Sequence, residues 1–149
     1  MLTQHPGGTE FTKARNHERM SGRLMPAMRH EFEDCSGRVI GAAIAVHTAL
    51  GPGFLESIYQ GALEIELELR GIEFQRQAEV HVQYKGEVVG RHRLDLVVEQ
   101  SVVVELKAVS VVLEAHLAQL RSYLKATDTR AGLLLNFSAP VLGVRRAVN

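Results

Sequence analysis

Apolar residues recur at three- and four-residue spacing in three stretches of the chain, which is the pattern of helices with one buried face. The first helix is expected to begin at Asp34 or Ser36, either of which can cap a helix, and to end at Gly51. The second is expected over about residues 54–70 and the third over about residues 113–127. In the second helix, the residues predicted to face inward are Leu55, Ile58, Tyr59, Ala62, Ile65 and Leu69.

Between the second and third helices, apolar and polar residues alternate with period two, which is typical of strands. Residues 80–84 and 94–98 are predicted to form two strands joined by a Lys85-Gly86 turn. A second turn near Gln100 leads into a third strand over residues 102–109. Strands joined by such short turns form an antiparallel meander.

Two further strands are predicted after the third helix. The fully apolar run from Gly132 to Leu135 predicts a central buried strand, and residues 144–148 predict a short edge strand. The order of helices and strands predicts an α/β fold with a mixed sheet of about five strands, flanked by helices.

The N-terminal stretch follows neither helical nor strand spacing. Residues 1–34 mix Pro6, Gly7 and charged residues with few apolar ones. We therefore predict a disordered arm over residues 1–34 and a single domain over residues 35–149. Met28 lies near the end of this arm and could be an alternative translation start.

Composition narrows the class of protein. A chain of 149 residues that is 46% hydrophobic can form one compact domain with a real core. It has no apolar run of the ~20 residues that cross a bilayer, no apolar signal segment near its start and a single cysteine, Cys35. We therefore expect a soluble, cytoplasmic protein with no membrane contact.

Charge limits how the chain could contact nucleic acid. Seventeen basic residues balance seventeen acidic ones, so such a contact must be local rather than an effect of bulk charge. The cations after Lys107 could form a modest basic surface, or they could be scattered solvated charges.

Asp95 and Glu105 each stand among apolar residues, in strands joined by a tight turn. In an antiparallel pair, directly opposed residues point to the same side. The pairing that sets Val97 opposite Val103 also sets Asp95 opposite Glu105, whereas a shift of one residue would mix a carboxylate into each apolar layer. Lys107, two residues beyond Glu105, then lies on the same face.

Two carboxylates and a lysine on one face suit a metal site. Paired carboxylates repel each other unless a hard cation lies between them, and their oxygen atoms suit Mg²⁺ or Mn²⁺. A charged lysine cannot bind a metal, so Lys107 is expected to orient or deprotonate a water, or to neutralise charge on a phosphate. A surface ion-pair ladder has the same residue types, and the strand pattern alone leaves that alternative open.

A resemblance to a known family favours the metal site over the surface ion-pair ladder. The run Gly53-Phe54-Leu55-Glu56-Ser57-Ile58-Tyr59 matches a Gly-x-x-Glu-x-x-Tyr motif, and residues 51–148 resemble the small bacterial GxxExxY family named after it. That family is grouped with the PD-(D/E)xK nuclease superfamily, so the resemblance implies a restriction-endonuclease-like core. The superfamily places an acid on an early helix, an Asp on one strand and a (D/E)-x-K on the next. Glu56, Asp95 and Glu105-Leu106-Lys107 match these positions.

Other positions agree with the resemblance or depart from it. Leu94 stands where the superfamily signature has a proline, a position that does no chemistry. Gln119 and Tyr123 resemble the Gln-x-x-x-Tyr helix motif of RecB-like nucleases. Residues four apart share a helix face, so this amide and phenol could both reach a metal site or a phosphate. Glu56 lies in the first turn of its helix, where a solvated acid is also favoured by the helix dipole.

The histidines of the region expected to be ordered divide by position. His47 is predicted to pack on the inward side of the first helix, whereas His116 could face the site because it lies three residues before Gln119. His81 and His92 are interpreted as ordinary strand residues. The sequence contains no Cys and His cluster with zinc-ligand spacing and no Gly-rich phosphate loop.

The resemblance implies a Mg²⁺- or Mn²⁺-dependent nuclease acting on DNA. Asp95 and Glu105 would be the metal ligands, Glu56 an auxiliary ligand or water-positioning residue, and Lys107 the activating cation. The Gln-x-x-x-Tyr pair would support phosphate binding. The alternative is a non-catalytic nucleic-acid-binding or subunit-interaction module, since a fold does not determine a function. A homodimer or another protein partner is left open.

Overall fold

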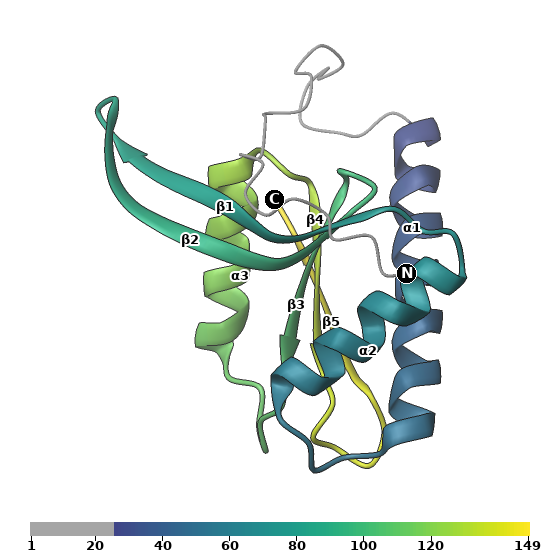
Figure 1. Cartoon of the computed structure of the whole chain (residues 1–149). Coiled ribbons are helices and arrows are strands. Elements are labelled where there is room, and N and C mark those ends of the chain that lie inside the picture. Colours follow the sequence, from purple (N-terminus) through teal and green to yellow (C-terminus); the bar gives the residue numbers. More distant parts are fainter. Residues whose placement is uncertain (1–25) are drawn as a thin grey trace, which may run out of the picture.

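The computed structural model describes residues 26–149 (Figure 1). All the strands lie in one sheet in the order β1-β2-β3-β4-β5, in which β3 and β4 are parallel and every other neighbouring pair is antiparallel. The predicted α/β fold, a mixed five-stranded sheet flanked by helices, is confirmed. The elements are α1 (Pro26–Leu50), α2 (Glu56–Leu69), β1 (Phe74–Tyr84), β2 (Glu87–Val98), β3 (Val102–Lys107), α3 (Glu114–Thr127), β4 (Ala131–Asn136) and β5 (Gly143–Val148).

Helices cover both faces of the sheet (Figure 1). α1 and α2 pack on one face, and α3 packs on the other. Successive residues of β3 pack in different cores. Val102 and Val104 lie beneath α1 and α2, whereas Val103 lies beneath α3. This double burial explains why β3 has an apolar run rather than alternating residues. Among residues 26–149, no helix is both long enough and apolar enough to span a bilayer.

Helix α1 begins at Pro26 and not near Asp34 as predicted. Proline is favoured at the first helical position, because its fixed φ suits the helix and its missing N–H would have no partner there. One turn is further tied by Arg38, whose Nε donates to Asp34 Oδ2 at 3.0 Å. Residues 26–34 therefore belong to α1 rather than to a disordered arm. The expectation for residues 1–25 lies outside the described residues.

The buried face of α2 also differs from the prediction. Tyr59, Leu63 and Leu67 are buried at four-residue spacing. Both this set and the predicted one fit a helix, because α2 carries apolar residues around much of its circumference, so periodicity alone could not choose between them. Four residues expected inside are exposed instead, namely Leu55 (73%), Ile58 (44%), Ile65 (56%) and Leu69 (77%).

The two predicted turns of the meander are present. The β1–β2 hairpin projects beyond the rest of the sheet (Figure 1), and its turn falls at Lys85 and Gly86, both with positive φ. Glu99 and Gln100 have positive φ in the β2–β3 turn, a conformation that costs non-glycine residues energy. Arg38 of α1 offsets this cost by donating two hydrogen bonds, of 2.8 and 2.7 Å, to the Glu99 carboxylate.

The turn between α1 and α2 is held by Tyr59. The Tyr59 hydroxyl donates to Gly51 O at 2.6 Å and accepts from Phe54 N at 3.1 Å. Gly53 in this turn has a φ of +114°, which glycine adopts without a steric penalty. The tyrosine ring is fully buried and stacks on Phe137, with ring centroids 4.6 Å apart. The Gly and Tyr of the Gly-x-x-Glu-x-x-Tyr motif thus fix the point at which α2 begins.

We expect Tyr59→Phe to lower the free energy of unfolding by about 1–3 kcal/mol, because two part-buried backbone groups lose their hydrogen-bond partner. Urea denaturation followed by circular dichroism measures the change. The control is Tyr84→Phe at the exposed end of β1, which should alter stability by less than about 0.5 kcal/mol. Equal urea midpoints for the two variants would contradict this role of Tyr59.

Candidate active site

Asp95 lies at a bend in β2. Leu94 packs in the core beneath α3, whereas Leu96 packs beneath α1 and α2. In a regular strand these two residues would share a face, as the alternation predicted, so the strand changes direction between them. Gln77, at the corresponding level of β1, has a φ of +52°. Both strands are therefore irregular at the level of Asp95.

The predicted register between β2 and β3 is confirmed. The antiparallel ladder consists of Leu96 with Val104, Val97 with Val103 and Val98 with Val102. Continuing this register by one residue brings Asp95 level with Glu105, which is where the ladder ends.

Beyond the ladder, the two carboxylates bind backbone amides of the opposite strand. Asp95 Oδ2 accepts a hydrogen bond from Leu106 N at 2.8 Å, and Glu105 Oε1 accepts one from Asp95 N at 3.2 Å. Each side chain therefore replaces a backbone acceptor of the interrupted ladder. This exchange fixes two acids side by side, as the strand pairing predicted.

Burial makes this pair electrostatically unusual. The Glu105 side chain is almost completely buried, with 8% of the residue exposed. Burial, and then the nearby charge of Asp95, raise the pKa of Glu105 from its ordinary value of 4.5 to about 8, although the charge of Lys107 acts in the opposite direction. Without a compensating cation, this site therefore favours a proton on Glu105 at neutral pH.

Glu56, the first residue of α2, lies within electrostatic reach of the pair. Burial, and then the charge of Asp95, raise the pKa of the half-buried Glu56 carboxyl, while Lys107 lowers it. Gln60, one turn further along α2, donates to Asp95 O at 3.4 Å. The start of α2 is thus tied to the bend of β2, and the structure brings Glu56 together with the strand residues.

Lys107 is the half-buried last residue of β3, and its backbone is held in place by β4. Lys107 O accepts from Phe137 N at 2.9 Å. Asn136 Oδ1 accepts from Val109 N at 3.1 Å, and Asn136 Nδ2 donates to Val109 O at 2.9 Å. The sequence analysis missed this clip, although a single polar residue that ends the apolar run 131–135 was a signal for it.

The Gln-x-x-x-Tyr pair borders the site from α3. Burial, and then the charge of Glu105, raise the pKa of Tyr123, while a hydrogen bond from the Gln119 side chain lowers it. Gln119 is itself exposed. His92 stacks on the Tyr123 ring, with ring centroids 3.9 Å apart and planes 9° apart. Tyr123 therefore adjoins the acids, and Gln119 reaches the site through Tyr123.

His92 was interpreted as an ordinary strand residue, and the structure places it at the site. Burial lowers its pKa, the charge of Asp95 raises it, and the charge of Lys107 lowers it. Its Nε2 atom is buried and has no hydrogen-bond partner within residues 26–149. Its place three residues before Asp95 was the only signal in the sequence. Because β2 bends at Asp95, alternate residues on the two sides of the bend do not share a face, so strand alternation could not place His92 at the site.

Two other histidines have structural roles. His47 is buried, with Nε2 2.8 Å from Ala139 O, so it packs as predicted. His116 does not face the site, because its Nδ1 accepts from Leu113 N at 3.0 Å and caps the start of α3.

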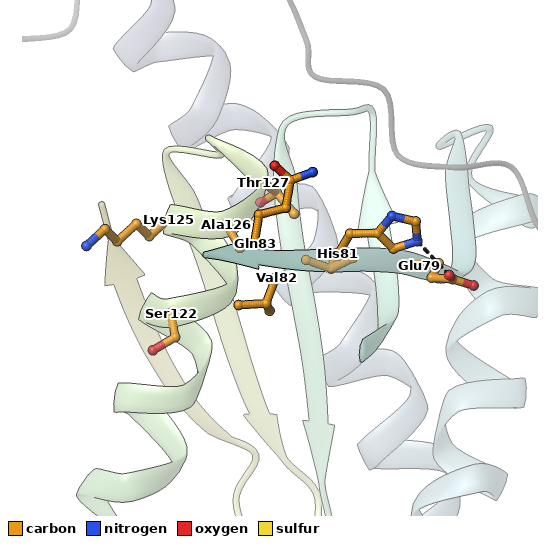
Figure 2. Close-up of a pocket in the computed structure, with 9 residues that line it drawn as sticks. Glu79, His81, Val82, Gln83, Ser122, Lys125, Ala126 and Thr127 are labelled. Carbon is orange, nitrogen blue, oxygen red and sulfur yellow. Dashed lines mark hydrogen bonds and ion pairs between the residues drawn. The ribbon is translucent and has the colours of Figure 1, made fainter. Parts of the chain in front are cut away.

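A pocket of about 590 Å³ lies between β1 and the C-terminal half of α3 (Figure 2). Its polar lining includes Lys125 and the hydrogen-bonded pair of His81 Nε2 and Glu79 Oε1, 2.7 Å apart. None of the acids predicted to bind a metal lines this pocket. The pocket is therefore separate from the carboxylate site.

The carboxylate oxygens of Asp95 and Glu105 are ligands that suit a hard cation bound by few protein groups. Within residues 26–149, no cluster of three or more His, Cys, Asp or Glu residues is assembled for a metal ion. Mg²⁺ commonly uses only one or two carboxylates and keeps several waters. The anchored pair of Asp95 and Glu105 fits that requirement.

Comparisons with known proteins bear on the fold and on the family of this chain. No curated protein matches the chain. Among solved structures, the crystal structure of SSO0001 is similar, with a TM-score of 0.53 and 19% sequence identity, and the match covers 82% of this chain and 61% of that one. This chain thus spans less than two thirds of that protein, and at this identity the likeness shows the fold alone. Membership of the narrower GxxExxY family stays a prediction.

A family model described as the PD-(D/E)XK nuclease superfamily matches residues 33–147. The match runs from α1 to β5 and includes the bend, the carboxylate pair and the lysine. The chain therefore belongs to the PD-(D/E)XK nuclease superfamily.

Proposed function

We propose that this chain is a metal-dependent nuclease that hydrolyses phosphodiester bonds in DNA. The superfamily supports nuclease activity in general. The observation that carries the specific proposal is the pair formed by the half-buried Asp95 and the buried Glu105, which are anchored to each other's strands. Two acids held this closely in a poorly solvated place are stabilised by a divalent cation more than by any other common ligand.

Asp95 and Glu105 would hold Mg²⁺ or Mn²⁺, with Glu56 as an auxiliary ligand or a water-positioning residue. When bound, the cation would polarise a phosphoryl oxygen and lower the pKa of a water. Glu56 suits its part because its raised pKa makes it a better proton acceptor than an exposed carboxylate. The turn between α1 and α2, which is held by Tyr59, would keep Glu56 close to the scissile phosphate.

Lys107 would act on the attacking water or on the charge that develops on the phosphate. Its ammonium is close enough to influence the pKa values of both Glu56 and Glu105. The Asn136 clip beyond it holds the chain that leaves β3, which favours a fixed position for the lysine. A fixed charge contributes more to transition-state stabilisation than a mobile one.

Gln119 and Tyr123 would contact a phosphate of the substrate, with His92 supporting the Tyr123 ring from β2. DNA is the proposed substrate. Because the chain has no net charge, its binding must depend on such local contacts, and we expect it to be weak and sensitive to salt.

The first test measures the cost of burying Glu105. The folded-state pKa is raised from 4.5 to about 8, so the folded chain keeps a proton that the unfolded chain releases. The contribution of Glu105 to stability is therefore fully present below about pH 4.5 and should be lost as the pH rises through about 8. We expect metal-free wild type to lose more stability between pH 5 and pH 8 than Glu105→Gln, as measured by urea unfolding at each pH.

Saturating Mg²⁺ or Mn²⁺ should reduce this difference, because binding favours the ionised carboxylate. The glutamine can still accept the Asp95 amide hydrogen bond, so the fold is preserved in the variant. Identical pH dependence in wild type and Glu105→Gln would contradict the electrostatic account of the pair.

The second test separates the metal ligands from the lysine. Asp95→Asn keeps an acceptor for Leu106 N but loses the charge, so it should weaken metal binding in calorimetry and reduce DNA cleavage at least ~100-fold. Lys107→Met should spare most of the metal affinity and reduce turnover by roughly 10²–10⁴. Glu87→Gln and Lys85→Met, both at the hairpin tip, are matched controls and should cleave like wild type.

The assay offers supercoiled, linear and single-stranded DNA with Mg²⁺ or Mn²⁺. Cleavage that survives in Asp95→Asn would come from a contaminant. A wild type that binds metal but cleaves none of these substrates would contradict the nuclease proposal and favour a non-catalytic nucleic-acid-binding or subunit-interaction module.

A further inference from the structure

Helix α2 carries a second apolar stripe whose large residues its own fold leaves exposed, although Ala62 at its centre also packs against the core beneath α2. This outer stripe consists of Leu55, just before the helix, and Ile58, Ala62, Ile65 and Leu69. Ala62 is half-buried, but the other four residues are between 44% and 77% exposed. The intervals along the stripe are three, four, three and four residues, the spacing of a helix surface that packs along another helix. Large apolar residues gathered at this spacing mark an interaction surface.

We infer that the outer stripe of α2 packs against the outer stripe of a second copy of this chain, with the two helices antiparallel. The stripe is close to symmetric about Ala62, with a leucine seven residues away on each side and an isoleucine four residues before and three after it. Turning one copy by a half-turn about Ala62 therefore sets Leu55 against Leu69 and Ile58 against Ile65. A two-fold contact requires such self-complementarity, whereas a contact with a different partner does not.

The centre of the stripe allows the helices to approach closely. Gly61 is exposed, and a Cβ placed on it would meet nothing within 4 Å. Glycine inside a helix lowers its stability by roughly 1 kcal/mol relative to alanine, so an open position gives no reason within the monomer for a glycine. A neighbouring helix that crosses at Gly61 and Ala62 supplies that reason, because small residues bring helix axes together.

Charge selects the antiparallel arrangement. The acids Glu64, Glu66 and Glu68 all follow Ala62, and the part of α2 before it has only Glu56, which belongs to the candidate active site. Parallel helices would set the acidic halves against each other. Antiparallel helices set each acidic half against the less acidic half of the other copy, which reduces that repulsion. A 14-residue helix spans only about 21 Å, so we expect a weak dimer with a dissociation constant on the order of micromolar.

Sedimentation velocity on the full chain, from about 1 to 300 µM, tests the association. Wild type should shift from monomer to dimer, and Ile65→Glu should weaken the dimer by at least about 10-fold, because it introduces an acid into the apolar contact. Gly61→Gln should weaken it similarly without lowering the melting temperature, since the site is open and glutamine favours helix. Val88→Glu, at an exposed valine of the hairpin, is the matched control and should leave the dimer unchanged.

A wild type that remains monomeric over this range, or equal dimerisation in Ile65→Glu and Val88→Glu, would overturn the inference. Neither outcome depends on nuclease activity. Orientation is tested with two single-cysteine variants, Leu55→Cys and Leu69→Cys, since the native Cys35 is only 1% exposed. Under mild oxidation, the mixture should form a disulfide-linked dimer containing one of each, and neither variant alone should. Efficient crosslinking of Leu55→Cys with itself would overturn the antiparallel arrangement.

Discussion

Two acids held side by side at the end of the β2–β3 ladder constrain much of the surrounding structure. Asp95 and Glu105 satisfy backbone amides that the ladder leaves behind, and in doing so they bring like charges together in a poorly solvated place. Such an arrangement costs free energy, because burial and the neighbouring charge both disfavour the ionised carboxylates. Each acid reaches its backbone amide only when Asp95 stands level with Glu105. The β2–β3 register therefore has to be exact to the residue, and the valines on both faces of β3 fix it by feeding two separate cores.

The elements around the pair are each fixed by a different interaction. The Tyr59 hydroxyl holds the turn that starts α2, and Gln60 then ties α2 to the carbonyl of Asp95. Asn136 clips the segment that follows Lys107. His92 holds Tyr123 by stacking from β2. Different interactions on two helices and three strands thus hold the segments that surround the carboxylate pair.

The sequence predicted what depends on strand alternation and on motif spacing. The register followed because a shift of one residue would mix a carboxylate into each apolar layer, and the order of elements followed from the change between helical and strand periods. The bend at Asp95 could not be predicted, because it shows only in the different partners of Leu94 and Leu96. The same bend hid His92, since alternate residues no longer share a face across it. The sequence also could not predict which side of α2 is buried, because its two apolar stripes both have helical spacing.

Leu94 shows how this chain can keep the bend without the proline of the superfamily signature. A proline fixes φ through its ring and has no N–H to offer a neighbouring strand. Leu94 pairs with Ala78 of β1 and is completely buried beneath α3, whereas Leu96 is completely buried on the other face. Burial of the two leucines in different cores forces the strand to turn between them, and Asp95 is the residue at that turn. Tertiary packing on both faces of the sheet can therefore hold the strand in this conformation where the superfamily signature has a proline ring.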